Sequence, residues 1–328
     1  MPLAVIIVSF ESVQLLPQSV ASAIEQTQPG DTVILWDNGS GLSTQQCLNS
    51  LQSKWPDLNI HRSPKNLGFA GGNNKAAMLV PKHDLLLLNP DAILQPGALN
   101  AMRTALEDNA RTAAVGAVQF SLDIQTIDGL GDAYHFTGLP WRSAFGAPAS
   151  QLTTILNDHG KRTSPIFSAC GAAALYRRCA WDAANGFDID YFCYCEDVDL
   201  GFRLRLAGWD CLRANAAHVL HAGSLSTGKD SDFSVYHGHR NLVWTFVKNM
   251  PTVLLALFLL PHLLMNALAM IHYLLLGRGK TIAHAKWDAF KGLPGAWKKR
   301  ARIHQSRRIS SWQLWKILSK SPLKTKNA

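Results

Sequence analysis

The clearest position for chemistry in this sequence is a carboxylate at the end of an apolar run. Residues 85–88 are four consecutive leucines, and Asn89-Pro90-Asp91 ends the run. A carboxylate suits a hard divalent cation, and Mg²⁺ commonly takes only one or two of them, leaving its other positions to water and phosphate oxygens. Asp91 is therefore a candidate ligand for a metal ion that also binds a diphosphate. The alternative is an ordinary Asn-Pro-Asp turn.

A second cluster of acids lies in residues 187–200. Five carboxylates and four aromatic residues fall within this segment, and Glu196 and Asp197 begin what we expect to be a helix ending at Gly208. One or two acids at a helix N-terminus are ordinary caps. Capping explains five of them poorly, because like charges a few ångströms apart repel unless a ligand or metal uses them.

Two further segments carry groups suited to ligand binding, each with a structural alternative. Residues 66–74 contain three glycines and three asparagines, so the backbone here can approach a ligand closely and aim helix N–H groups at an anion. A loop with positive φ angles is the alternative. Neither a Gly-x-Gly-x-x-Gly fingerprint nor a P-loop is present. His218 and His221 offer two imidazoles, although a lone histidine is more often structural than catalytic.

The elements around these residues alternate between apolar strands and helices. Strands are expected at 3–9, 32–36, 58–61 and 84–88, with helices between them. Such alternation predicts a mainly parallel α/β sheet covered on both faces. Ligands bind at the carboxyl ends of its strands, where the turns at Asp37 and Asp91 fall. A helix from Pro96 to about Glu107 and a strand at 113–119 are expected next, followed by loops to residue 165.

Charge divides the chain unevenly. The net charge is +9, yet residues 1–277 hold 18 Lys and Arg against 22 acids, and residues 278–328 hold 14 against the single Asp288. The most apolar stretch, 253–276, comes just before this basic end. An apolar run beside a basic tail fits an anionic membrane surface better than nucleic acid.

The six cysteines are scattered and contain no Cys-x-x-Cys pair, so they indicate neither a disulfide framework nor a zinc ribbon. The N-terminal residues lack a basic region and a small-residue cleavage site, and they predict a buried strand rather than a signal peptide. Together these features predict a location in the cytoplasm.

In their order, these motifs resemble family 2 glycosyltransferases, and in particular the rhamnosyltransferase-like branch that builds bacterial surface polysaccharides. The resemblance spans about residues 3–248 and rests on these segments: Asp37-Asn38-Gly39-Ser40, 66–74, 87–92, Gly186-Phe187-Asp188, 196–200 and His221-Ala222-Gly223-Ser224. It implies a GT-A fold over residues 1–246, with a nucleotide-sugar half at 1–95 and an acceptor and catalytic half at 96–246. Residues 247–328 would form apolar helices and a basic tail.

The resemblance also implies a role for each matching residue. The donor would contact Ser9, Asp37, Asn38, Asn66, Gly68, Phe69, Asn73, Asn89 and Asp91. Asp91 and His221 would hold Mg²⁺ or Mn²⁺, and Asn89 replaces the first acid of the family's metal motif. Asp197 would be the catalytic base with Glu196 beside it, and sugar transfer would invert the anomeric carbon.

The implied donor is a nucleoside-diphosphate sugar, either deoxythymidine-diphosphate rhamnose or a uridine-diphosphate sugar, and the acceptor is a lipid-linked saccharide. Two alternatives stay open: a sugar-nucleotide pyrophosphorylase, and a non-catalytic membrane protein that kept the fold. The pyrophosphorylase would need an N-terminal Gly-rich loop with Arg and Lys, and residues 9–20 contain none. The non-catalytic protein would be expected to lose Asp91, Glu196 and Asp197.

Residues 253–276 are long enough, at about 36 Å as a helix, to span a bilayer. Pro261, His262, Asn266 and His272 interrupt the run, and a single crossing would place the basic tail outside, against the positive-inside rule. We therefore expect a pair of shorter helices that dip into the cytoplasmic face of the inner membrane. A buried helical hairpin is the alternative. Tryptophans interleaved with Lys and Arg in the tail suit the headgroup region.

Overall fold

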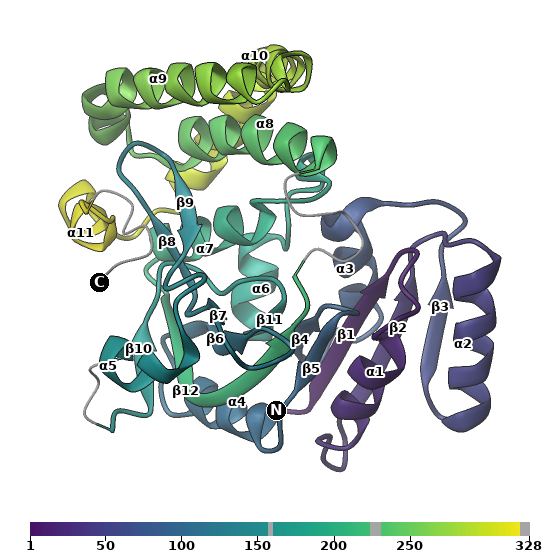
Figure 1. Cartoon of the computed structure of the whole chain (residues 1–328). Coiled ribbons are helices and arrows are strands. Elements are labelled where there is room, and N and C mark those ends of the chain that lie inside the picture. The colour runs from purple at the N-terminus through teal and green to yellow at the C-terminus, as the bar shows by residue number, and fades with distance from the viewer. Residues whose placement is uncertain (157–159, 224–230, 322–328) are drawn as a thin grey trace.

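The computed structural model describes residues 1–156, 160–223 and 231–321. Its strands are β1 (Leu3–Ser9), β2 (Thr32–Asp37), β3 (Asn59–Arg62), β4 (Asp84–Leu88), β5 (Ala92–Leu94), β6 (Thr112–Phe120), β7 (Ile127–Gly129), β8 (Asp132–Tyr134), β9 (Pro140–Arg142), β10 (Thr163–Pro165), β11 (Ala173–Tyr176) and β12 (Asp210–His221). The main sheet has the order β10-β12-β6-β11-β4-β1-β2-β3, with β5 paired to β12 and β7 to β6 (Figure 1). Strands β8 and β9 form a separate hairpin.

The N-terminal half of the sheet is parallel, as the alternating pattern predicts. Strand β1 pairs with β2 and with β4 in parallel, and all residues of β1 and β4 are buried. Ser9 lies opposite Asp37, and Ile7 lies opposite Leu88. The polar residues that follow β2 and β4 therefore emerge at the same edge of the sheet.

The other half of the sheet is mixed and brings distant residues to that edge. Strand β11 is antiparallel to both β4 and β6, and β12 is parallel to β6. Strand β12 also pairs with β5 in antiparallel register, which sets His221 opposite Ala92. Because Ala92 follows Asp91 directly, this pairing brings His221 next to the Asn89-Pro90-Asp91 turn.

Helices cover both faces of the sheet. The chain contains α1 (Leu16–Ile24), α2 (Leu42–Lys54), α3 (Gly68–Met78), α4 (Ala98–Glu107), α5 (Leu152–Leu156), α6 (Arg178–Ala184) and α7 (Glu196–Leu206), with short 3₁₀ turns at Ala149–Gln151 and Ile189–Tyr191. Apolar residues of α1, α2 and α4 form one buried cluster with the sheet, and those of α3, α6 and α7 form another. This arrangement is the flanked sheet of the GT-A fold.

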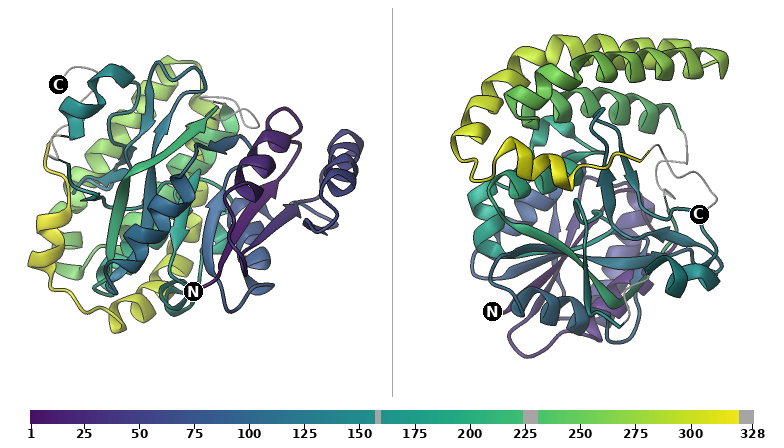
Figure 2. Two further views of the ribbon diagram at one scale, coloured as in Figure 1. Left: turned by 90° about the horizontal axis from the view of Figure 1, so that it is seen from below. Right: turned by 90° about the vertical axis from the view of Figure 1, so that its left-hand side faces the viewer.

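The C-terminal helices are α8 (Asp232–Asn249), α9 (Thr252–Leu275), α10 (Gly279–Gln305) and α11 (Ser311–Ile317). Figure 2 shows α8, α9 and α10 packed together on one side of the molecule, away from the sheet. Phe246 of α8 and Phe258 of α9 share a buried cluster with Phe202 of α7. The expected domain boundary at 246/247 falls in the last turn of α8, which continues to Asn249.

The expected pair of short helices at 253–276 is wrong, because Pro261 lies inside one continuous helix, α9. Two polar residues of the run turn inward: Nδ1 of His262 lies 2.7 Å from the carbonyl oxygen of Thr137, and Lys286 Nζ donates to Oδ1 of Asn266 at 2.5 Å. Among the described helices, α9 is the one long and apolar enough to cross a membrane, and only 17% of its most apolar window is buried. The alternative of a buried hairpin is therefore also wrong.

Candidate functional site

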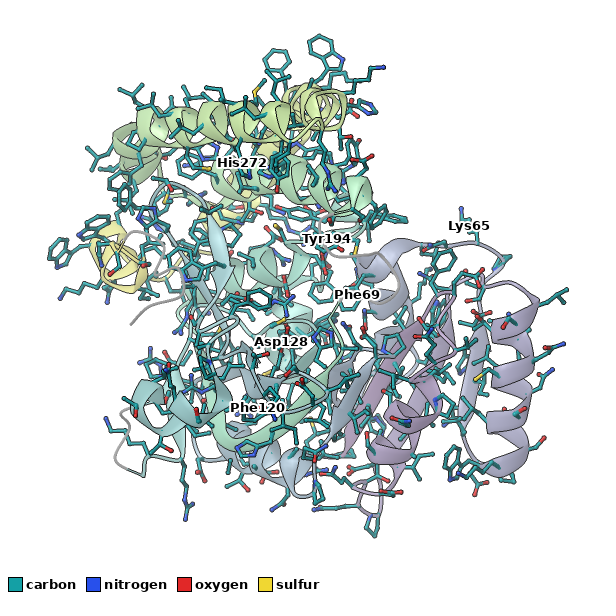
Figure 3. All side chains as sticks on the ribbon, in the orientation of Figure 1. Lys65, Phe69, Phe120, Asp128, Tyr194 and His272 are labelled. Carbon is teal, nitrogen blue, oxygen red and sulfur yellow. The ribbon has the colours of Figure 1, made fainter. Side chains whose placement is uncertain are left out.

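A cavity of about 590 Å³ opens where the carboxyl ends of β1, β2 and β4 meet the start of α7. The residues that line it include Asn38, Asn66, Gly68, Phe69, Asn89, Asp91, Asp132, Trp141, Arg142, Gly171, Phe192, Tyr194, Glu196, Asp197, His221 and Phe233. In Figure 3 the labelled Phe69, Asp128 and Tyr194 lie in the middle of the molecule, below the C-terminal helices. Asp91, His221 and Asp197, which are far apart in the sequence, thus line one cavity.

His221 lies between two carboxylates. Its Nδ1 bonds to Oδ2 of Asp128 at 2.8 Å, and its Nε2 lies 3.4 Å from Oδ1 of Asp91. Burial alone would lower the pKa of His221, but the hydrogen bonds and charges of Asp128 and Asp91 outweigh it and raise the pKa to about 9. Arg142 also forms an ion pair with Oδ2 of Asp128 at 2.5 Å.

This arrangement fits a divalent cation, which would bind the neutral imidazole in place of the proton that Asp91 and Asp128 stabilise. A metal-bound histidine usually donates its second ring N–H to a carboxylate, and Asp128 is in that position for His221. Asn89 Oδ1 is buried and has no hydrogen-bond partner among the described residues, while its Nδ2 lies 3.4 Å from His221 Nε2. No cluster of three or more His, Cys, Asp or Glu suited to a metal occurs in the described parts of the chain. A cation here would therefore need ligands from a bound substrate.

The two adjacent carboxyl groups at the start of α7 have different surroundings. Asp197 Oδ2 accepts from the Gly171 N–H at 2.8 Å, and Oδ1 accepts from the Val198 N–H at 2.8 Å. Burial raises the pKa of Asp197, and these two hydrogen bonds limit the rise. Burial and the charge of Asp197 raise the pKa of Glu196 much further, and Glu196 Oε2 has no partner among the described residues. Asp197 is therefore the better candidate for an ionised base.

The expected donor residues fall into two groups. Asn38, Asn66, Gly68, Phe69, Asn89 and Asp91 line the cavity. Ser9, Asp37 and Asn73 are buried behind its wall, where Asp37 accepts from the Ser40 N–H and Asn73 donates to the carbonyl of Phe69. These three residues support the wall and do not face the cavity.

Hydrogen bonds hold the glycine-rich segment in place. Asn38 Nδ2 donates to Oδ1 of Asn66 at 2.9 Å and to the carbonyl of Gly68 at 3.0 Å. Gly68 has a φ of +72°, and a Cβ there would lie 2.4 Å from the carbonyl oxygen of Phe192. Only glycine allows this close approach of two backbones.

Comparison with models of known protein families assigns the chain to a family. The sequence model "Glycosyl transferase family 2" matches residues 4–181, which is more than half of the chain. The chain belongs to glycosyltransferase family 2. It is therefore an enzyme that transfers a sugar, and this assignment favours neither the pyrophosphorylase nor the non-catalytic alternative.

Similar proteins agree with this assignment. The chain is 28% identical over 258 residues to an N-acetylglucosaminyl-diphospho-decaprenol L-rhamnosyltransferase of Mycobacterium tuberculosis, covering 72% of this chain and 81% of that protein. The structure resembles a mannosyltransferase of Pyrobaculum calidifontis bound to GDP-Man and Mn²⁺, with a TM-score of 0.55, 14% identity, and coverage of 93% and 85%.

It also resembles GalNAc-T7 with UDP, GalNAc and Mn²⁺, with a TM-score of 0.59 and 14% identity, over 76% of this chain and about half, 48%, of that one. At these identities the two structures show the fold alone. They confirm that this glycosyltransferase has a GT-A fold.

Asp128 and Arg142 are site residues of this glycosyltransferase that the sequence does not predict. They lie on β7 and β9, strands of three residues each, in a segment that the sequence predicts to be loops. The partner of Asp128 is His221, 93 residues away. Neither strand is long enough to show the alternation of apolar and polar residues that identifies a strand. The only sequence signal for this part of the site is the presence of acids among the glycines and aromatic residues of 120–145.

Proposed function

We propose that the protein is an inverting glycosyltransferase that moves a sugar, rhamnose in the first instance, from a nucleoside-diphosphate donor to a hydroxyl of a lipid-linked saccharide. The observation that carries the proposal is the placement of Asp91, His221 and Asp197 around one cavity. The choice of rhamnose and of a lipid-linked acceptor is supported by the mycobacterial relative, whose name includes both. Deoxythymidine-diphosphate rhamnose is the first donor to test, and uridine-diphosphate sugars are the second.

The donor would occupy the side of the cavity formed by Asn38, Asn66 and Gly68, with its diphosphate toward Asp91. We propose that Asp91, His221 and the amide oxygen of Asn89 hold Mg²⁺ or Mn²⁺ together with that diphosphate. Such a cation supplies charge neutralisation on the departing diphosphate. Arg142, fixed by Asp128, adds a positive charge to the same wall.

Asp197 would act as the general base. An acceptor hydroxyl that attacks the anomeric carbon opposite the leaving diphosphate must lose its proton as the new bond forms. The Oδ atoms of Asp197 keep further lone pairs after accepting from Gly171 and Val198, so the carboxylate is held in place and can still take that proton. Displacement in one step requires no covalent sugar–enzyme intermediate and hence no second catalytic carboxylate.

The acceptor side of the cavity is aromatic and lies below the C-terminal helices. Phe192, Tyr194 and Phe233 line it, and their rings pack edge to face or tilted against one another. Apolar and aromatic walls are typical of sites that bind organic ligands. We propose that the acceptor sugar enters along this wall, with its lipid toward α9 and α10.

We further propose that α9 and α10 rest on the cytoplasmic face of the inner membrane. The outward side of α9 and the neighbouring part of α10 expose Val253, Leu257, Leu260, Leu263, Leu264, Leu268, Ile271, Leu274, Leu275, Trp287, Phe290 and Trp297. Exposed basic residues of α10, namely Lys280, Lys291, Lys298 and Arg302, would meet anionic headgroups, each contributing about 1 kcal/mol. A transmembrane orientation would instead break the contacts of His262 and Asn266 with Thr137 and Lys286.

A donor screen with the full-length protein tests the proposed function. Nucleotide sugars are offered with Mn²⁺ or Mg²⁺ and a lipid-linked N-acetylglucosaminyl diphosphate, and the product is examined by NMR. We expect turnover of a deoxyhexose or hexose donor and a product whose anomeric configuration is opposite to that of the donor. A product of retained configuration, or formation of nucleotide sugar from nucleoside triphosphate, would contradict the proposal.

A further inference from the structure

Three residues just before the candidate base adopt backbone conformations that are unfavourable for side chains with a Cβ. Phe192 has φ 64° and ψ −62°, Tyr194 has φ 69°, and Cys195 has φ 65°. Positive φ is uncommon for residues other than glycine, and it persists only where the surrounding structure enforces it. Segment 192–195 leads directly into Glu196 and Asp197 at the start of α7.

Asn241 of α8 holds this segment from behind. Its Nδ2 lies 2.9 Å from the carbonyl oxygens of Tyr191 and Cys193 and 2.8 Å from that of Tyr194. Asn241 is fully buried, so water does not satisfy these carbonyls in its place. An amide nitrogen carries two hydrogens and no lone pair available to accept, so it suits a point where carbonyl oxygens converge.

Segment 192–195 also contacts the donor side of the cavity. The Phe192 carbonyl accepts from the Ala70 N–H at 3.1 Å, next to the close approach at Gly68. The C-terminal end of segment 192–195 leads into the first turn of α7, where the Cys195 carbonyl accepts from the Asp199 N–H at 2.9 Å. The position of Asp197 relative to the donor therefore depends on the conformation of these four residues.

Other contacts hold the two ends of the segment and the residues before it, and Asn241 bonds the carbonyls of Cys193 and Tyr194 in its middle. Arg240 Nη2 donates to the carbonyls of Asp190 and Tyr191, each at 3.0 Å, and Lys248 Nζ pairs with Asp188 and Asp199. Asn241 thus reaches the segment between the contacts of Arg240 and Lys248, through the carbonyls of Cys193 and Tyr194.

Resting on the proposed role of Asp197, we infer that Asn241 is a positioning residue, which holds segment 192–195 in its strained conformation and thereby sets the catalytic base against the donor. Asn241 is not among the residues that line the cavity, so a substrate bound there would not contact it directly. Its removal should therefore slow the chemical step and leave donor binding nearly intact.

The test compares Asn241→Ala and Asn241→Ser with Leu242→Ala in the full-length protein. Leu242 is buried on the next position of α8 and makes no hydrogen bond to the segment, so its truncation controls for loss of stability. We expect kcat of Asn241→Ala to fall by about 10- to 100-fold, as a misplaced catalytic group does, with donor KM changed by less than about threefold. Asn241→Ser, which keeps one donor, should retain more activity, and Leu242→Ala should keep the wild-type kcat below its melting temperature.

Amide hydrogen exchange gives a second readout that does not require activity. Exchange of residues 190–199 should accelerate in Asn241→Ala and stay slow in Leu242→Ala, with β1 and β4 protected in both. An unchanged kcat, an equal loss of kcat in Leu242→Ala, or unchanged exchange of 190–199 would overturn the inference. If wild-type protein turns over no donor, the proposed function fails, and the exchange result still decides the role of Asn241.

Discussion

Asp128 bonds to Nδ1 of His221 at 2.8 Å, while Nε2 of the same ring lies 3.4 Å from Asp91. The carboxylate of Asp128 thus orients the imidazole toward the end of β4, where the candidate metal ligands lie. Two short strands of the poorly patterned middle of the chain supply Asp128 and the Arg142 that pairs with it. Asp128 and Arg142 are the main residues that the structure adds to the site expected from the sequence.

Replacing Asp128 should weaken metal binding without removing a metal ligand. Loss of a carboxylate that orients a metal-bound histidine typically costs 10–100-fold in metal affinity or activity, about the effect we expect for Asp128→Asn. Calorimetric titration of Mn²⁺ in the presence of nucleoside diphosphate measures it directly. Asp123→Asn is the control, because Asp123 is exposed and bonds only to its own loop. Equal Mn²⁺ affinity in the two variants would exclude this role of Asp128.

The pH dependence of kcat/KM should report the ionisation of Asp197. Burial raises the pKa of Asp197 above the ordinary carboxyl value of 3.8, and a base works only when it is ionised. Activity should therefore be lost, as pH falls, at a pH higher than 3.8. The charge of Arg142 lowers the pKa of Asp197, so Arg142→Gln should move this acid limb to still higher pH. A limb that stays in place or moves to lower pH in Arg142→Gln would count against Asp197 as the titrating base.

Charges placed on the outward side of α9 should release the protein from membranes. Leu260 is 65% and Leu264 57% exposed, and neither belongs to the buried cluster that joins α9 to α7 and α8. Since burying one leucine contributes about 1.5–3 kcal/mol, the pair Leu260→Glu and Leu264→Glu should lower partitioning into anionic vesicles by at least about tenfold.

The matched control for this pair is Leu42→Glu, because Leu42 is 83% exposed at the start of α2, far from α9 in Figure 1. Co-sedimentation with vesicles measures the bound fraction. If the α9 pair sediments as well as the Leu42 variant, α9 is not the membrane-facing surface.

The sequence predicts those parts of the site that follow long, regular elements. β1 and β4 have the predicted bounds, so the turns at Asp37 and Asp91 lie at the expected edge of the sheet. The helix expected to begin at Glu196 and end at Gly208 is α7, Glu196–Leu206. Local pattern sufficed for these elements because each buries a continuous or periodic set of side chains.

Other features depend on tertiary contacts that no local pattern records. Asp128 and Arg142 lie on three-residue strands, and Asn241 acts through backbone carbonyls about 50 residues earlier. Pro261 was expected to divide α9, yet the helix continues through it. Tertiary contacts on both sides of Pro261, with Leu254 and Phe258 in a buried cluster and His262 against Thr137, hold the helix together. His262 and Asn266, two of the residues that interrupt the apolar run, attach α9 to the rest of the protein.

Whether Asp197 is the catalytic base is decided by measuring sugar transfer by Asp197→Asn together with the affinity of this variant for nucleoside diphosphate. The substitution keeps the shape of the side chain and removes its ability to take a proton. Because a positioned base contributes about 10²–10⁴-fold, transfer should fall at least about a hundredfold while nucleotide affinity stays within about threefold of wild type. Transfer that survives above about a tenth of the wild-type rate would contradict the assignment of Asp197 as the base.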